Sequence, residues 1–116
     1  MTRGDVVLVR VPHASGSRGK KRPVVVIQSD QYLGTLGTLV VAEVTSNLEM
    51  ADDPACLMIE VNTQDGQATG LLRDSVISGL LIVTVYADAV DQTLGKLSPA
   101  LLTRFENCLR VAIGLS

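Results

Sequence analysis

The stretch SPALLTRFENCLRVAIG, residues 98–114, is the clearest structural signal in the chain. Ser98 and Pro99 supply an N-cap and a proline at the first helical position, and Gly114 supplies a C-terminal stop. The apolar residues that recur at helical spacing on one face are Leu101, Leu102, Phe105, Cys108, Leu109, Ala112 and Ile113. The stretch therefore predicts an amphipathic helix that packs on a sheet.

Upstream of this helix the sequence favours short strands. The apolar residues are mostly Val, Leu and Ile, with one Phe and no Trp, and β-branched side chains suit strands. Apolar runs bounded by turn residues predict strands at 6–11, 23–27, 38–44, 57–61, 70–72, 75–77 and 80–85. Residues 62–70 are expected to form a hairpin loop with Asp65-Gly66 as its tight turn.

This order of elements predicts a mainly β fold of the α+β class. We expect a small SH3-like, strongly curved antiparallel barrel with a C-terminal helix, formed by residues 1–116 as a single domain. The longest apolar run, 79–85, is too short to span a bilayer. Cys56 and Cys108 lack CxxC spacing, so we expect two reduced thiols packed in or near the core of a cytoplasmic protein.

The basic residues gather in one short segment. The formal net charge is −2, so a nucleic-acid partner would need a local basic patch. Residues 18–22, RGKKR, hold four of the ten basic residues, and such a loop is most often merely solvated. Arg22 differs because it directly precedes Pro23 at the mouth of a predicted strand. A guanidinium held there can clamp a phosphate bidentately.

A second polar group follows the strand predicted at 38–44. Thr45, Ser46 and Asn47 would ordinarily satisfy backbone groups of the loop. If Thr45 lies beside Arg22, the two form a phosphate site. Asp74 is expected to be a turn residue.

The sequence has few residues suited to histidine, carboxylate, nucleotide or metal catalysis. His13 is the only histidine, and the sequence has no carboxylate pair at helical spacing, no P-loop and no cluster of metal ligands. This inventory predicts electrostatic catalysis without a metal or other cofactor.

Five motifs, in order along the chain, resemble the MazF/PemK toxin family. They are Gly4-Asp5-Val6-Val7, KRPVVVIQSD at 21–30, Val44-Thr45-Ser46-Asn47, GLLRDSVI at 70–77, and Gly95-Lys96-Leu97-Ser98. The resemblance implies a sequence-specific, metal-independent endoribonuclease toxin of a type II toxin-antitoxin system. Such a toxin cleaves single-stranded RNA by attack of the ribose 2′-hydroxyl, leaving 2′,3′-cyclic phosphate and 5′-hydroxyl ends.

The resemblance also assigns roles to residues. Arg22 would stabilise the phosphorane, and Thr45 would donate a hydrogen bond to a phosphate oxygen. Residues expected to contact RNA are Ser15, Ser17, Lys20, Lys21, Ser46, Asn47 and Ser75. The implied partners are a second copy of the chain, with the RNA groove lying partly across the interface, and a cognate antitoxin, MazE-like or other.

Two alternatives remain open. A catalytically weak SH3-like binding module is favoured by the apolar stretch Gly79-Leu80-Leu81-Ile82-Val83, where many relatives carry polar Gln or Arg residues. A gyrase poison of the CcdB type shares the expected fold. That family depends on a C-terminal Trp-Gly-Ile, whereas this chain ends Gly114-Leu115-Ser116.

Overall fold

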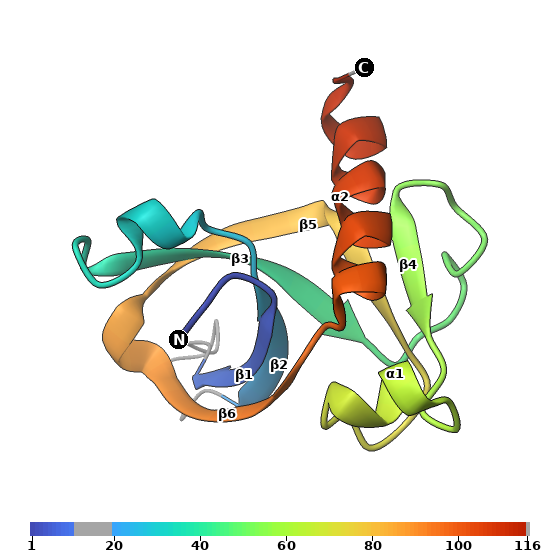
Figure 1. Ribbon diagram of the computed structural model, residues 1–116, viewed down its shortest axis with the longest axis horizontal. Helices are drawn as coiled ribbons and strands as arrows, with labels where there is room; N and C mark the ends of the chain where they lie inside the picture. Colours follow the sequence, from blue (N-terminus) through green and yellow to red (C-terminus); the bar gives the residue numbers. More distant parts are fainter. Residues whose placement is uncertain (11–19, 116) are drawn as a thin grey trace.

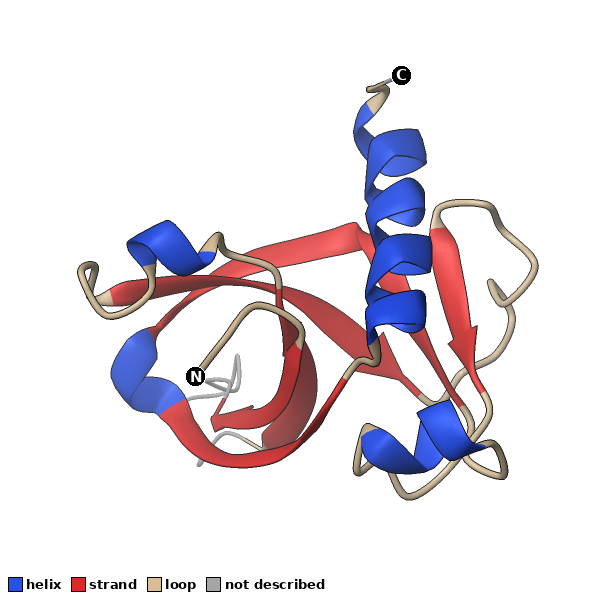
Figure 2. Ribbon diagram, in the orientation of Figure 1, coloured by secondary structure: helices blue, strands red, loops and turns tan. Residues whose placement is uncertain are grey.

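The sheet is wholly antiparallel and strongly curved. The computed structural model describes residues 1–10 and 20–115, in which six strands follow the order β4-β5-β3-β2-β1-β6. The elements are β1 (Asp5–Arg10), β2 (Lys21–Val26), η1 (Asp30–Tyr32), β3 (Thr38–Thr45), β4 (Cys56–Ile59), α1 (Gln64–Ala68), β5 (Ser75–Tyr86), η2 (Ala87–Ala89), β6 (Val90–Lys96) and α2 (Pro99–Ile113). Figures 1 and 2 show the curled sheet with α2 packed beside β4 and β5. The predicted curved antiparallel sheet with a C-terminal helix is confirmed.

The valine side chains of β1 and β2 contribute to two hydrophobic cores, one on each face of the sheet. Val24, Val25 and Val26 are almost fully buried, although successive side chains of a strand point to opposite faces. Val25 belongs to the cluster that includes Phe105 of α2, whereas Val24 and Val26 belong to a second cluster with β1 and β3. The continuous apolar run is therefore required because both faces of β2 are covered.

The helix α2 begins and ends as the sequence predicts. The hydroxyl oxygen of Ser98 accepts a hydrogen bond from the amide of Leu101 at 3.2 Å, and Pro99 occupies the first turn. Gly114 adopts the left-handed conformation at φ 73°, which favours glycine. Among residues 1–10 and 20–115, no helix is long and apolar enough to cross a membrane.

The buried face of α2 is narrower than predicted. Leu101, Phe105 and Cys108 are buried, but Ile113 is 62% exposed because the helix extends beyond the sheet. Cys108 and Cys56 are both buried and free, as predicted. Burial raises the pKa of the Cys108 thiol, and the neighbouring Cys56 raises it further, so Cys108 stays protonated at neutral pH.

Between residues 70 and 86 the sequence analysis predicted three short strands, and the structure has one long strand. The segment 70–72 is not a strand, and the two short strands predicted at 75–77 and 80–85 are one strand, β5. The inner part of β5 pairs with both β4 and β3, while its outer part pairs with β3 alone. The polar and glycine residues at 78–79 lie in the bend beside α2 and do not end the strand.

Two further elements differ from the prediction. Residues 62–70 contain α1 in place of a tight hairpin turn, because the hydroxyl of Thr63 caps the helix by accepting from the amide of Gly66 at 2.9 Å. The strand β6 was not predicted. It is an edge strand whose polar residues Asp91, Gln92 and Thr93 are exposed, so it lacks an apolar signature.

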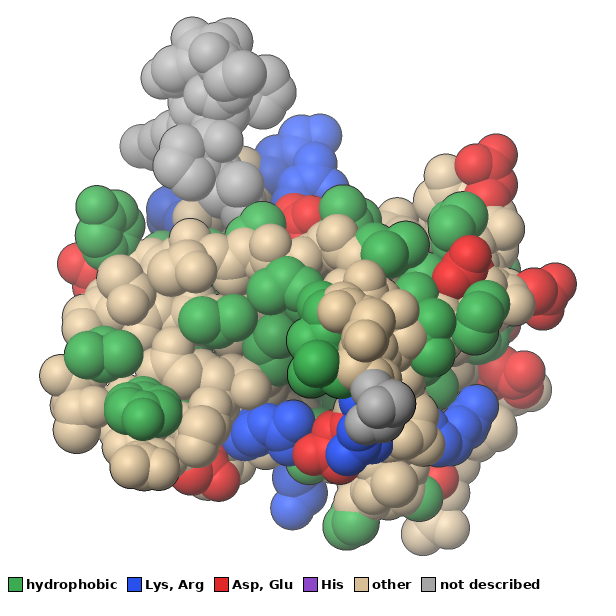
Figure 3. All heavy atoms as spheres, turned by 90° about the horizontal axis from the view of Figure 1, so that it is seen from above, with side chains coloured by type: hydrophobic (Ala, Val, Ile, Leu, Met, Phe, Trp, Pro, Cys, Tyr) green, Lys and Arg blue, Asp and Glu red, His purple; other side chains and the backbone are tan. Residues whose placement is uncertain are grey.

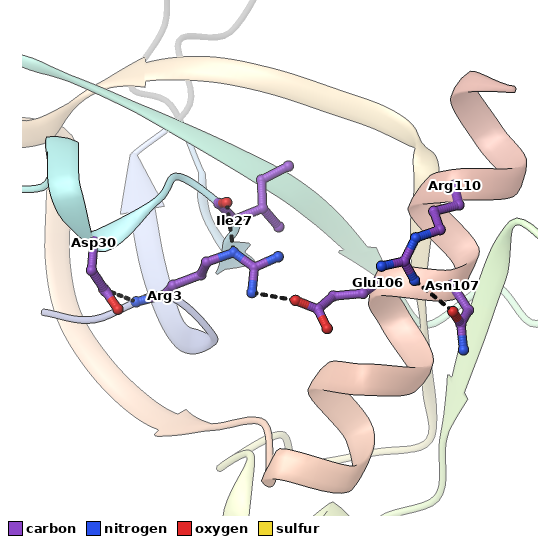
Figure 4. Close-up of polar contacts among 6 residues, drawn as sticks. All are labelled: Arg3, Ile27, Asp30, Glu106, Asn107 and Arg110. Carbon is purple, nitrogen blue, oxygen red and sulfur yellow. Dashed lines mark hydrogen bonds and ion pairs between the residues drawn. The ribbon is translucent and has the colours of Figure 1, made fainter. Parts of the chain in front are cut away.

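Arg3 ties three parts of the fold together (Figure 4). Its backbone amide donates to a carboxylate oxygen of Asp30 at 2.7 Å, and its guanidinium donates to the carbonyl of Ile27 at 3.2 Å. The same guanidinium forms an ion pair with Glu106 of α2 at 2.8 Å. Figure 4 also shows a neighbouring bond from Arg110 to Asn107. These contacts orient the entry to β1 against the end of β2 and against α2.

We expect Phe105→Ala to lower the free energy of unfolding by about 3–5 kcal/mol, because it empties a fully buried site between the sheet and α2. Urea denaturation followed by circular dichroism measures the change. The matched control is Thr103→Ala on the exposed face of the same helix, with an expected change within about 0.5 kcal/mol. Equal losses in both variants would contradict this account of the core.

Candidate functional site

A groove opens where β2 and β3 separate. The two strands pair only from Val24 opposite Glu43 to Val26 opposite Val41. Beyond Glu43 the register of β3 shifts, and Thr45 pairs with β5. The Lys21–Pro23 half of β2 therefore has no partner in β3, and a groove lies between this half and the end of β3.

The groove has a volume of about 630 Å³ and gathers residues from distant parts of the chain. They are Leu8 of β1, Lys20, Lys21, Arg22 and Pro23, Val44, Thr45 and Ser46 at the end of β3, Gly70, Leu71, Leu72, Arg73 and Ser75, and Gln92 and Leu94 of β6. Arg22 and Thr45 therefore line the same groove. Arg22 is the second residue of β2, so the strand begins two residues earlier than predicted.

The groove concentrates positive charge in a chain of net charge −2. Lys20, Lys21, Arg22 and Arg73 line it, and among the described lining residues there is no carboxylate. Lys21 is partly neutralised from outside by Asp91 of β6, at 2.9 Å. Apolar side chains among the lining residues lower the local dielectric constant, which strengthens the attraction for an anion.

The polar residues after β3 have divided roles. The hydroxyl oxygen of Thr45 accepts a hydrogen bond from the amide of Asn47 at 3.1 Å, and its O–H has no acceptor among the described residues. Ser46 lines the groove. The side chain of Asn47 accepts from the amide of Glu49 at 3.0 Å, and Asn47 does not line the groove. Thr45 and Ser46 therefore line the groove with hydroxyl groups, and the side-chain amide of Asn47 stabilises the turn.

The segment before β5 forms a wall of the groove. Ser75 is buried, and its hydroxyl donates to the carbonyl of Arg73 at 2.8 Å, so it holds the wall as well as lining it. The carboxylate of Asp74 accepts from the amide of Val61 at 2.9 Å, a turn role as predicted. Arg73 and Gln92 are groove residues that the sequence analysis missed, since only the fold brings β6 beside this segment.

Some predicted residues fall elsewhere. Ser15 and Ser17 lie outside the described residues, as does His13. Within the described part of the chain, no three His, Cys, Asp or Glu side chains are grouped as metal ligands would be.

Comparison with known protein families gives a match over nearly the whole chain. A model of the PemK-like, MazF-like toxins of type II toxin-antitoxin systems matches residues 2–113. The chain belongs to this toxin family. The resemblance predicted from the five motifs is confirmed.

Similar family members cover nearly the whole chain. Endoribonuclease MazF6 of Mycobacterium tuberculosis is 32% identical over 117 residues, spanning 99% of this chain and 98% of that protein. Endoribonuclease MazF of Staphylococcus saprophyticus is 32% identical over 116 residues, spanning 99% and 92%.

Solved structures of MazF toxins share the fold. A mycobacterial endoribonuclease in complex with its cognate antitoxin superposes with a TM-score of 0.81 at 17% identity, covering 100% of this chain and 97% of that one. A MazE-MazF structure from Deinococcus radiodurans gives a TM-score of 0.74 at 17% identity, with 100% and 97% coverage.

The apolar stretch at Leu80–Val83 lies outside the groove. None of its residues is among the described lining residues, and Leu80, Leu81 and Val83 are exposed. Val111, Ile113 and Leu115 at the C-terminal end of the chain are exposed as well, and we call these six exposed apolar side chains the apolar face. Figure 3 shows hydrophobic side chains across this side of the molecule, bordered by Lys, Arg, Asp and Glu side chains. The apolar composition of the outer part of β5 therefore belongs to the apolar face and not to the groove.

We expect Gly70→Ala to distort the groove, because Gly70 has φ +74° and an added Cβ would overlap the carbonyl of Leu94 in β6. Gly34→Ala is the matched control, since Gly34 has φ +82° but nothing within 4 Å of an added Cβ. The control should lose about 1–2 kcal/mol from the left-handed backbone alone. Gly70→Ala should lose about 1–3 kcal/mol more in urea denaturation. Equal losses would show that β6 yields to the added methyl group.

Proposed function

We propose that this chain is a sequence-specific, metal-independent endoribonuclease that cleaves single-stranded RNA. The observation that carries the proposal is the groove, which brings Arg22 and Thr45 together among basic side chains with no described carboxylate. Support also comes from the chain's membership of the toxin family and from relatives that are named endoribonucleases.

In the proposed reaction, the 2′-oxygen of a ribose loses its proton and attacks the adjacent phosphorus. The P–O5′ bond then breaks, and the 5′-oxygen takes up a proton, leaving a 2′,3′-cyclic phosphate and a 5′-hydroxyl. One proton leaves the 2′-oxygen and one is taken up at the 5′-oxygen, so the step balances by exchange of both protons with water in the open groove. The protein contributes mainly by stabilising charge that grows on the nonbridging oxygens.

Arg22 and Thr45 have distinct parts in this stabilisation. The guanidinium of Arg22 is permanently charged and presents a planar fork of donors to the phosphate oxygens. Thr45 donates a single hydrogen bond, because its hydroxyl carries one proton, while its oxygen accepts from the amide of Asn47. Lys20, Lys21 and Ser46 would contact the flanking backbone. Asn47 and Ser75 would position the turn and the wall, and a direct contact of Ser15 or Ser17 with RNA stays a prediction.

We expect Arg22→Ala to slow cleavage of a long single-stranded RNA in EDTA by about a thousandfold, since it removes the charge that faces the phosphorane. Thr45→Ala should slow it by about a hundredfold, and Thr45→Ser should retain most of the rate because the hydroxyl remains. Arg104→Ala, which removes one positive charge on α2 outside the groove, is the matched control.

Mapping of the fragment ends tests the reaction itself. Wild-type protein should give discrete fragments with 5′-hydroxyl and cyclic phosphate ends. Failure of the folded, antitoxin-free protein to cleave any of several unrelated RNAs would reject the nuclease proposal and favour a binding module.

We further propose that two copies of the chain associate through the apolar face. Six exposed apolar side chains on the outer part of β5 and the end of α2 would cost free energy if left in water. Gly79 allows the two elements to meet, since an added Cβ there would lie 3.2 Å from the Cβ of Ala112. A second copy bearing the same face is a self-complementary partner for a twofold dimer.

Sedimentation equilibrium should give a mass near twice 12.3 kDa for the wild type. Leu81→Glu and Ile113→Glu should each shift the protein to the monomer, because a dimer would bury the new charge. Leu36→Glu, which alters an exposed leucine in the loop after η1, should leave the dimer intact. A wild-type monomer at micromolar concentration would contradict the proposed interface.

The groove also suggests how an antitoxin would bind. We propose that a cognate antitoxin, MazE-like or other, inhibits the toxin by placing an acidic segment in the groove in competition with RNA. Structures titled as antitoxin complexes of related toxins support this partner class. Because RNA is the substrate and both cysteines are free, we propose that the protein acts in the cytoplasm.

A further inference from the structure

The groove has a second wall that the proposed reaction does not use. Arg22 and Thr45 belong to the β2–β3 side, whereas Arg73 and Gln92 come from the segment before β5 and from β6. We infer that this second wall holds the nucleotide next to the cleaved bond, with Arg73 on its phosphate and Gln92 on the edge of its base. The inference rests on the proposed function for the identity of the ligand.

Arg73 has a fixed backbone and a free charge. Its carbonyl accepts from the hydroxyl of Ser75 at 2.8 Å, and the next residue, Asp74, holds the amide of Val61 at 2.9 Å. No carboxylate of the described residues lies within 4.0 Å of the Arg73 guanidinium, whereas Lys21 is paired with Asp91. An exposed guanidinium that is not neutralised, on a rigid segment lining the groove, is suited to a phosphate.

Gln92 is placed to read a base. It is exposed on β6, opposite Leu8 of β1 in the ladder, and two residues before Leu94 on the same strand. A side-chain amide offers both a donor and an acceptor, which match the edges of an unpaired base. Leu8, Leu71 and Leu94 are partly buried beside it and present apolar surface to the flat face of the base.

The combination favours a nucleic-acid strand over other anions. Cationic groups from separate parts of the chain, Arg22 and Arg73, line one groove together with apolar side chains. This arrangement matches the alternation of phosphate and base along single-stranded RNA. A free phosphate would leave the apolar surface and the amide of Gln92 without a role.

The test uses RNA that cannot be cleaved, so that binding is measured apart from catalysis. The probe is a fluorescein-labelled pool of random-sequence, single-stranded RNA with every ribose 2′-O-methylated, which blocks attack by the 2′-oxygen. Fluorescence anisotropy at several salt concentrations gives the affinity and its salt dependence for each variant, and circular dichroism checks folding.

Arg73→Ala should weaken binding about tenfold, as loss of a charged hydrogen bond does. It should also reduce the slope of log affinity against log salt concentration by about 0.7, the value for one phosphate contact on a single strand. Arg73→Lys should restore the slope, because it retains the charge. Arg104→Ala, with the same charge change outside the groove, should match the wild type.

Sequencing of the bound fraction tests Gln92. Gln92→Leu should flatten the base preference at one position beside the cleaved bond while leaving the salt dependence unchanged. Equal affinity and slope in Arg73→Ala and Arg104→Ala would overturn the phosphate contact, and an unchanged base preference in Gln92→Leu would overturn the base contact. Binding of a fluorescein-labelled acidic peptide, with no binding of the RNA probe, would overturn RNA as the occupant.

The two proposals can fail separately. Cleavage of unmodified RNA by the wild type, with no effect of Arg73→Ala on binding of the probe, rejects the second wall and keeps the nuclease. Binding of the probe that depends on Arg73, without any cleavage, keeps the second wall and rejects the nuclease.

Discussion

The structure depends on the way that β3 changes partners. Near Ala42 the strand pairs with both β2 and β5, but after its register shift at Glu43 it continues with β5 alone. A sheet that kept β2 and β3 together would be flatter and would have no opening at the Lys21–Pro23 end. The register shift inserts extra residues into β5 opposite Glu43, and such a bulge bends a sheet. The bend of the sheet and the opening of the groove therefore lie at the same point of β3.

Pro23 fits this separation. Proline lacks a backbone N–H and is tolerated in a strand only where no partner needs that donor. Here Pro23 lies just beyond the end of the β2–β3 ladder, with Arg22 next to it on the unpaired side. The Arg-Pro dipeptide thus marks the point where pairing with β3 ends, while pairing with β1 continues, and the exposed Arg22 lines the groove. The missing N–H of Pro23 therefore coincides with the position of Arg22, the residue proposed to bind phosphate.

Sequence reasoning succeeded where one element carries its own signal. The caps of α2 and the valine runs of β1 and β2 are local, and these elements lie where they were predicted to within two residues. The strand β6 was not predicted because Gln92 and its neighbours are exposed on an edge strand and show no apolar periodicity. Arg73 was not predicted as a groove residue for a different reason, since its position there requires Gly70 to approach the backbone of β6. Such contacts between distant segments are not encoded in spacing along the chain.

The strand β5 shows how one element can serve two surfaces. Its first five residues are buried, and Ser75 among them supports the groove. At Gly79 the strand bends beneath α2, and from Leu80 onward it turns apolar side chains to the outside. Replacement of polar residues in this outer part therefore changes the apolar face without removing any described lining residue of the groove. The apolar composition of β5 is thus compatible with the proposed phosphate site, because the bend at Gly79 separates the apolar face from the groove.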